Sequence, residues 1–191
     1  EELSPNLVNA AVATEDSRFY KHSGIDFESL ARVLVKTVLG GSSSQGGGST
    51  ITQQLAKTLY PREDVGSPFK MVWIKLKEWI TAVKLERNYT KDEIMTMYMN
   101  QVFFGSNAYG IKAAAQTFFG KNPIDLTVEE AATLVGMVNK PTRYNPALNP
   151  DKSLARRNLV IGRMEKNGFL TAHERDSIQQ IPITLSYQIQ D

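Results

Sequence analysis

The feature that most constrains the fold of this 191-residue chain is a pattern that occurs four times, a threonine followed three residues later by glutamine or glutamate. In such a capping box the threonine hydroxyl accepts a hydrogen bond from the third helical N–H, and the longer side chain reaches back to the N–H of the threonine. Each occurrence therefore marks the start of a helix. The pairs are Thr50 with Gln53, Thr90 with Glu93, Thr127 with Glu130, and Thr171 with Glu174, and the last three predict helices near 91–101, 128–139 and 172–180.

Other start and stop signals predict further helices and leave no strand-rich region. A serine before a proline is a favourable helix start, and glycine is a frequent helix end. The tail, residues 181–191, alternates apolar and polar residues, so it is either a strand or the lead into a further domain. We predict a mainly α fold of eight or nine helices. The additional helices are expected from Ser4-Pro5 to about residue 17, from Asp26 to Gly40, over 70–88, from about 111 to Gly120, and from Asn149-Pro150 to Gly168.

Two of these helices carry an apolar face at helical spacing. The sets are Phe27, Leu30, Ala31, Leu34, Val35 and Val38 in the first, and Val72, Leu76, Trp79, Ile80 and Val83 in the second. Glycine- and serine-rich residues 40–48 and proline-containing residues 60–69 are predicted to be mobile loops. These loops flank a segment that could form a small mobile lobe.

Composition excludes several classes of site. The chain has no cysteine and two histidines, so disulfides, thiolate metal sites and a histidine-rich metal site are not expected. The net charge is +2, from 22 basic and 20 acidic residues, and no block of like charge suggests a nucleic acid partner. No run approaches the roughly 18 apolar residues of a membrane span. The chain begins at Glu1 without methionine, and we expect it to be a piece of a longer protein.

Three polar clusters stand out as candidate sites. The first centres on Glu15, which follows Val8, Ala11 and Val12 on one predicted helix face that continues to Phe19. A glutamate is rarely buried unless it is paired or functional, so Glu15 is either a general base or the partner of Arg18. Close by in sequence, His22 is interpreted on its own as a hydrogen-bonded loop residue.

The second cluster is Gly48-Ser49-Thr50 with Gln53, Gln54 and Lys57. A Gly-Ser-Thr turn into a helix start can bind an anion, although Thr50 and Gln53 could serve only as a cap. The third cluster is Lys70, Lys75 and Glu78, which alone is most often a solvated ion pair. Together, two glutamates, several lysines and a helix-start anion site suit the transfer of a sugar from a diphosphate.

Five segments in order resemble the peptidoglycan glycosyltransferases, which include the polymerase domain of class A penicillin-binding proteins and the monofunctional glycosyltransferases. Residues 15–24 read Glu-Asp-Ser-Arg-Phe-Tyr-Lys-His-Ser-Gly, and residues 48–57 read Gly-Ser-Thr-Ile-Thr-Gln-Gln-Leu-Ala-Lys. Residues 75–78 read Lys-Leu-Lys-Glu, and residues 91–100 read Lys-Asp-Glu-Ile-Met-Thr-Met-Tyr-Met-Asn. The fifth segment is 130–136, followed by Pro141 and Tyr144-Asn145-Pro146.

The resemblance implies a lysozyme-like helical head and a small, flexible, membrane-facing jaw over roughly residues 28–75. It also implies an N-terminal membrane helix before this chain and, in the bifunctional proteins, a transpeptidase domain after it. The implied reaction polymerises lipid II into β-1,4-linked glycan on the extracytoplasmic face of the cell membrane, and moenomycin-type inhibitors would bind the same site. The anomeric centre of the undecaprenyl-diphosphate-linked donor inverts, and the acceptor is the 4-hydroxyl of lipid II.

The resemblance also implies roles for individual residues. Glu15 would be the general base, and Glu78 the second catalytic carboxylate, near the donor diphosphate, where a divalent metal such as Mg²⁺ or Mn²⁺ could bind. Asp16, Phe19, His22 and Gly24 would hold the first segment in shape. The donor cleft would be lined by Ser49, Thr50, Gln53, Gln54, Lys57, Lys70 and Lys75.

Two positions depart from the family pattern. The family usually has arginine at the position of Ile74, and often at that of Lys70, where lysine keeps the charge but loses the bidentate fork. Two other functions stay open: a lysozyme-like hydrolase or lytic transglycosylase, which would also use a glutamate, and a non-catalytic module that binds lipid-linked sugar or the membrane.

Overall fold

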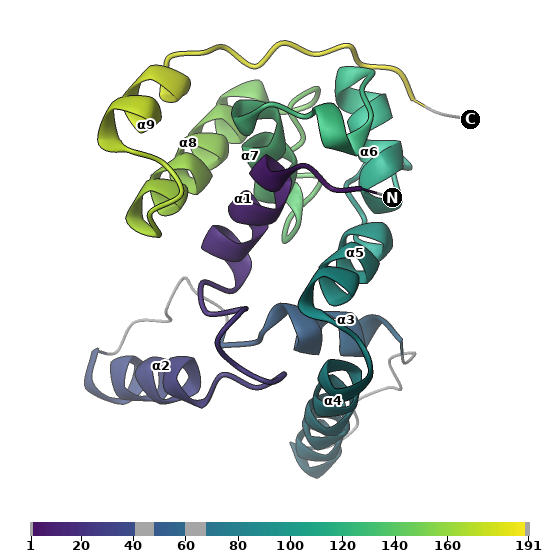
Figure 1. Ribbon diagram of the computed structural model, residues 1–191, viewed down its shortest axis with the longest axis vertical. Helices are drawn as coiled ribbons and strands as arrows, with labels where there is room; N and C mark the ends of the chain where they lie inside the picture. The colour runs from purple at the N-terminus through teal and green to yellow at the C-terminus, as the bar shows by residue number, and fades with distance from the viewer. Residues whose placement is uncertain (1, 41–47, 60–67, 190–191) are drawn as a thin grey trace. The chain divides into compact units, whose positions relative to one another are not determined.

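The computed structural model describes residues 2–40, 48–59 and 68–189 (Figure 1). Within these ranges the chain forms nine α-helices, one 3₁₀ helix and no strand, which confirms the predicted mainly α fold. The chain divides into two compact units that are described separately. Unit 1 comprises residues 1–17 and 99–191, and unit 2 comprises residues 18–98.

Unit 1 is built around its first helix. The Ser4 hydroxyl accepts a hydrogen bond from the Leu7 N–H at 3.1 Å, and Pro5 occupies the first turn, as predicted. This helix packs on α7 and α8, and the three lie side by side (Figure 1). The helices of unit 1 are α1 (Pro5–Glu15), α6 (Gly110–Phe119), η1 (Pro123–Asp125), α7 (Val128–Met137), α8 (Pro150–Lys166) and α9 (Ala172–Gln179), with the end of α5 (Lys91–Gln101).

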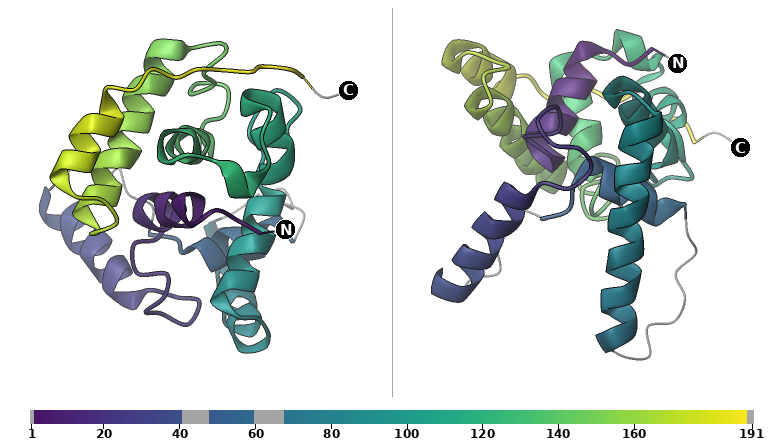
Figure 2. Two further views of the ribbon diagram at one scale, coloured as in Figure 1. Left: turned by 45° about the horizontal axis from the view of Figure 1, so that its top comes forward. Right: turned by 60° about the horizontal axis from the view of Figure 1, so that its bottom comes forward.

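The described part of the C-terminal tail is extended and forms no strand. It runs from α9 to α6, as the yellow segment of Figure 2 shows. The N–H groups of Ser186 and Gln188 donate to the carbonyls of Phe118 and Thr117, both at 2.9 Å. The tail is therefore attached to α6 by main-chain hydrogen bonds without a partner strand.

Unit 2 contains α2 (Phe27–Gly40), α3 (Ile51–Thr58), α4 (Pro68–Asn88) and most of α5. All four capping boxes of the chain are present, including Thr50 with Gln53 and Thr90 with Glu93 in this unit. The predicted loops 40–48 and 60–69 fall largely on residues 41–47 and 60–67, which lie outside the described residues. The predicted jaw, residues 28–75, lies within unit 2, and its independent motion stays a prediction.

Much of the described part of the apolar faces of α2 and α4 is exposed. Phe27 is 68% exposed, and Val72 and Ile80 on α4 are 60% and 57% exposed. The side chains that α4 buries are Glu78 and Ala82, on the stripe beside the apolar face. The pattern thus identifies an apolar face correctly but does not reveal that this face lies toward solvent.

The predicted helix face from Val8 to Phe19 is wrong beyond Glu15. The helix ends there because Asp16 leaves the helical conformation, with φ −158° and ψ 79°. Phe19 is fully buried, but it lies in unit 2.

Gly24 is needed at a close approach in unit 2. Its φ is +96°, and a Cβ at this position would lie 2.9 Å from the backbone C and O of Ala82. Gly24→Ala is expected to lower the free energy of unfolding by about 2–4 kcal/mol, because it adds backbone strain and a contact with rigid backbone. Denaturant unfolding measures this loss.

The matched control is Gly162→Ala. Gly162 lies within α8, and a Cβ there would meet nothing within 4 Å. This change should stabilise the helix by up to about 1 kcal/mol. Equal effects of the two substitutions would contradict the close approach at Gly24.

Candidate active site

Glu15 is the last residue of α1. Its side chain lies at the end of this helix, after the residues that α1 buries in the core of unit 1. Its carboxylate is partly exposed, and the Asn139 side-chain amide donates to both oxygens, at 3.0 and 3.2 Å. Arg18, the alternative partner considered from the sequence, forms ion pairs with Asp26 at 3.2 Å and with Glu28 at 2.5 Å. The amide contact leaves Glu15 a carboxylate that can still accept a proton.

Asn139 is a residue that the sequence reasoning missed. It follows α7, whose residues 131–137 are all buried, and it is 124 residues from Glu15 in sequence. In the sequence, the one feature that could have pointed to Asn139 is its place as a polar residue between an apolar helix and Lys140-Pro141. A pairing over this distance in sequence could not be read from spacing.

The segment that follows Glu15 is held by internal contacts. Asp16 is buried, and its N–H bonds to the Val12 carbonyl at 3.1 Å. In unit 2, the ring of Phe19 packs edge-on against His22, and the Lys91 ammonium lies 4.5 Å from the Phe19 centroid. His22 Nδ1 accepts a hydrogen bond from the Gly24 N–H at 3.1 Å, which agrees with its interpretation as a loop residue.

Asp26 fixes the start of α2 close to this segment. Burial raises the pKa of Asp26, but hydrogen bonds from Ser29 and the positive charge of Arg18 outweigh burial and hold the pKa below its ordinary value. The Ser29 N–H donates to Asp26 at 3.1 Å. Asp26 is thus an ionised cap of α2, as the sequence predicted.

Thr50 and Gln53 are buried and form the cap of α3. The Thr50 hydroxyl accepts from the Gln53 N–H at 3.1 Å and donates to the Gly24 carbonyl at 2.7 Å, so it joins α3 to the first segment. Gln53 Oε1 accepts from the Thr50 N–H at 2.9 Å. Among the described residues, the buried Gln53 Nε2 has no hydrogen-bond partner.

The other predicted residues of α3 are Gln54 and Lys57. Gln54 accepts a hydrogen bond from the Tyr98 hydroxyl at 3.1 Å. Lys57 is exposed in the last turn of the helix. The structure therefore gives these two residues different surroundings, one within unit 2 and one at its surface.

Lys75, Glu78 and Ser49 form one contact group. Lys75 Nζ donates to Glu78 Oε2 at 2.7 Å and to the Ser49 hydroxyl at 3.3 Å. Glu78 is buried, with 7% exposed, whereas the side chain of Lys75 is 46% exposed. Lys70 lies earlier on α4 and is partly buried. This arrangement presents a cation at the surface and holds a carboxylate behind it.

Glu78 is the carboxylate at which the sequence places a possible divalent metal. Its carboxylate is paired with the Lys75 ammonium at 2.7 Å. No group of three or more His, Asp or Glu side chains that could hold a metal occurs among the described residues. The metal at Glu78 stays a prediction.

The candidate residues are divided between the two units. Glu15 and Asp16 belong to unit 1, and the other ten, Phe19, His22, Ser49, Thr50, Gln53, Gln54, Lys57, Lys70, Lys75 and Glu78, belong to unit 2. Unit 1 supplies a carboxylate that can take a proton. Unit 2 supplies hydrogen-bond donors and ammonium groups that can bind an anion.

A family model described as transglycosylase matches residues 1–165 of this chain. Penicillin-binding protein 1A of Aquifex aeolicus is 40% identical over 185 residues, which are 97% of this chain and 25% of that protein. Penicillin-binding protein 1F of Bacillus subtilis is 42% identical over 93% of this chain and 24% of its own length. Penicillin-binding protein 1A of Escherichia coli is 39% identical over 98% of this chain and 21% of its own length. The chain thus spans about a quarter of the length of these relatives.

Removing the Lys75 ammonium should destabilise unit 2, because it leaves the buried Glu78 carboxylate without its counter-ion. We expect Lys75→Met to lower the free energy of unfolding by about 1–3 kcal/mol. The double variant Lys75→Met, Glu78→Gln should regain most of that loss, because the amide carries no charge. Denaturant unfolding of both variants measures the difference.

Lys84→Met is the control, since Lys84 is an exposed lysine of the same helix. Its stability should stay within about 0.5 kcal/mol of the parent chain. If the double variant is no more stable than Lys75→Met, the ion pair is not what holds Glu78.

Proposed function

This chain belongs to the transglycosylase family and is a glycosyltransferase domain, and we propose that it polymerises lipid II into β-1,4-linked glycan strands in bacterial cell-wall synthesis. The observation that carries the proposal is the Glu15 carboxylate, whose two oxygens both accept a hydrogen bond from the Asn139 side-chain amide. Such a group suits a general base, because it is oriented while remaining able to accept a proton.

In the proposed reaction, Glu15 takes the proton of the 4-hydroxyl of the acceptor lipid II. The acceptor oxygen forms a bond to C1 of the donor sugar, and the bond from C1 to the undecaprenyl diphosphate breaks on the opposite face. The diphosphate leaves with the bonding electron pair, so an α-linked donor gives a β-linked product in one displacement. No covalent enzyme intermediate is required.

The departing diphosphate would be stabilised by unit 2. Lys75 presents an ammonium group beside the Ser49 hydroxyl, and Lys57 and Lys70 are further cations. Charge-assisted hydrogen bonds to an oxyanion are stronger than neutral ones. Thr50 and Gln53 act first as the cap of α3, and the Ser49 hydroxyl beside Lys75 is a further donor for the diphosphate. Glu78 holds the Lys75 ammonium in place through its ion pair.

A membrane-facing role of unit 2 is also proposed, because the substrate carries a long lipid. Exposed apolar side chains on α2 and α4 support it: Phe27, Val35, Phe69, Met71, Val72, Trp73, Leu76 and Ile80. Exposed large apolar side chains in such number are typical of a surface that interacts with a membrane or a partner. None of the described helices is long and apolar enough to cross a bilayer. The proposed location is the extracytoplasmic face of the cell membrane.

Glu15→Gln tests the proposed base. The change keeps the shape and an acceptor for Asn139 but removes the basic carboxylate, so polymer formation from labelled lipid II should fall by about 100-fold or more. The melting temperature should stay close to that of the parent chain. Gel analysis of the labelled glycan provides the measurement.

Glu165→Gln is the matched control, because Glu165 is another partly buried carboxylate of unit 1, paired with Arg175 at 3.4 Å. Its polymerisation rate should be unchanged within about twofold. Full activity of Glu15→Gln would exclude Glu15 as the base. If the parent chain releases soluble sugar from finished peptidoglycan and makes no polymer, it is a hydrolase instead.

Lys57→Ala tests the proposed anion site. Loss of one charge-assisted contact should weaken the binding of a moenomycin-type phosphoglycolipid about tenfold. The exposed Lys84→Ala serves as control and should bind normally. Equal binding by the two variants, measured by titration, would remove Lys57 from the site.

A further inference from the structure

An arginine of α8 forms a hydrogen bond with the last turn of α1. Arg163 Nη1 donates to the Thr14 carbonyl at 3.1 Å, and Thr14 directly precedes Glu15. The last four carbonyls of a helix have no helical N–H to bind, and the Thr14 carbonyl is one of them. A basic side chain that bonds such a carbonyl also carries its charge to the negative end of the helix dipole.

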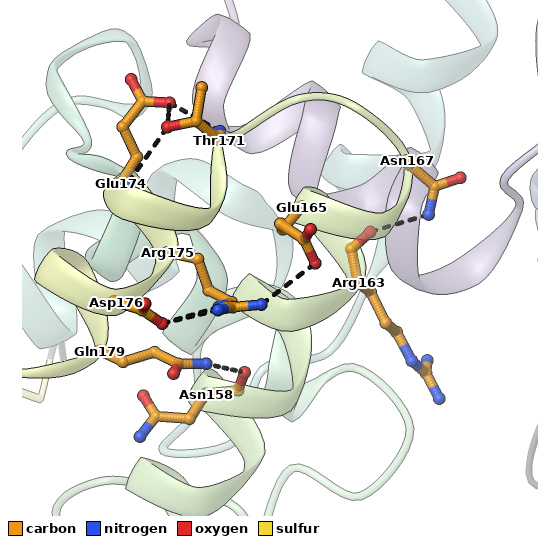
Figure 3. A network of polar contacts seen from close by, with 9 residues as sticks. All are labelled: Asn158, Arg163, Glu165, Asn167, Thr171, Glu174, Arg175, Asp176 and Gln179. Carbon is orange, nitrogen blue, oxygen red and sulfur yellow. Dashed lines mark hydrogen bonds and ion pairs between the residues drawn. The ribbon is translucent and has the colours of Figure 1, made fainter.

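The guanidinium of Arg163 takes part in none of the contacts between α8 and α9 that Figure 3 draws. Neighbouring polar side chains of α8 and α9 pair with one another, as Arg175 does with Glu165 and Asp176 (Figure 3). The Arg163 side chain points away from that group, and only its backbone carbonyl takes part, by accepting from Asn167 at 2.8 Å (Figure 3).

Arg163 and Glu15 are close enough to interact electrostatically. Burial lowers the pKa of Arg163, the charge of Arg156 lowers it further, and the negative charge of Glu15 acts in the opposite direction. Arginine nevertheless stays protonated in proteins. Arg163 therefore places a permanent, partly buried positive charge in the field of the proposed base.

A carboxylate at the C-terminal end of a helix lies in an unfavourable field, because that end of the dipole is negative. A general base must nevertheless be ionised to accept a proton. Two groups of unit 1 offset the negative end of the helix dipole. The Asn139 amide donates to both oxygens of Glu15, and the Arg163 guanidinium donates to the Thr14 carbonyl in the last turn of α1.

We propose that Arg163 is a positioning residue for Glu15: it fixes the last turn of α1 through the Thr14 carbonyl, and together with the Asn139 amide it holds the Glu15 carboxylate in one orientation. This inference rests on the proposed function. Arg163 needs no contact with substrate for this role. Its effect should therefore be on the rate and its pH dependence, not on the Michaelis constant.

The charged groups next to Glu15 in the described part of unit 1 come from α8 and from neighbouring segments of the chain. Helix α7 turns only uncharged residues, 131–137, into the core, and Lys140 follows Asn139. Helix α8 contributes Arg156 and Arg163, and Asp16 is next to Glu15 in the chain. Removing the positive charge of Arg163 should shift the acid limb of the activity profile to higher pH, because a nearby cation disfavours protonation of a carboxylate.

The test is the pH dependence of kcat/KM for lipid II polymerisation by the parent chain, Arg163→Met and Arg163→Lys. In Arg163→Met the acid limb should move up by about half a unit to one unit, with KM unchanged within about threefold. Arg163→Lys keeps the charge, so its acid limb should return to the parent position. Its kcat should stay reduced, because lysine lacks the planar fork.

Arg175→Met is the control for loss of an arginine from the same unit, and its profile should match that of the parent chain. An unshifted acid limb in a folded Arg163→Met, with kcat merely lowered, would overturn the inference while leaving the proposed function intact. If Arg163→Met does not fold, Arg163→Lys and Asn139→Ala test the inference in its place. A parent-like kcat in Arg163→Lys, together with an unshifted acid limb in Asn139→Ala, would also overturn the inference. Failure of the parent chain to polymerise lipid II would instead refute the proposed function.

Discussion

The close packing of α1 on α7 and α8 is the contact on which unit 1 depends. Small residues make it possible: Ala10 and Ala11 on α1 and Ala131 and Ala132 on α7 are completely buried. Gly136 continues this surface toward α8, where an added Cβ would lie 3.1 Å from Arg156 Cγ. Because three helices approach so closely, the end of α1 is fixed. Glu15 therefore receives its two supports, Asn139 from beyond α7 and Arg163 from α8, without any flexible segment.

Unit 2 uses the same local chemistry for folding and for the proposed ligand site. The Thr50 hydroxyl caps α3 and also ties it to the Gly24 carbonyl. This contact joins the first and second family segments. The Lys75–Glu78 pair similarly fixes an ammonium group beside Ser49. Residues that bind an anion need to be held in place before the ligand arrives. In unit 2, the hydrogen bonds that would hold the proposed residues also cap α3 or pair with the buried Glu78 carboxylate.

Local rules predicted what local contacts determine. The four capping boxes, the Ser4 cap and the Lys75–Glu78 pair involve residues three or four apart, and all of them are present. The contacts of Glu15 with Asn139 and of Thr14 with Arg163 span 124 and 149 residues, and no spacing rule reaches them. The exposed faces of α2 and α4 could not be predicted either, because periodicity identifies an apolar face without identifying what covers it.

We propose that one carboxylate, Glu15, supported within unit 1, acts as base in a single displacement on a diphosphate-linked sugar. The most direct measurement is the anomeric configuration of the glycan made from α-linked lipid II, determined by NMR spectroscopy of the purified product. Every new linkage should be β, since one displacement inverts the anomeric centre. Newly formed α linkages would show a double displacement through a covalent intermediate and would contradict the role assigned to Glu15.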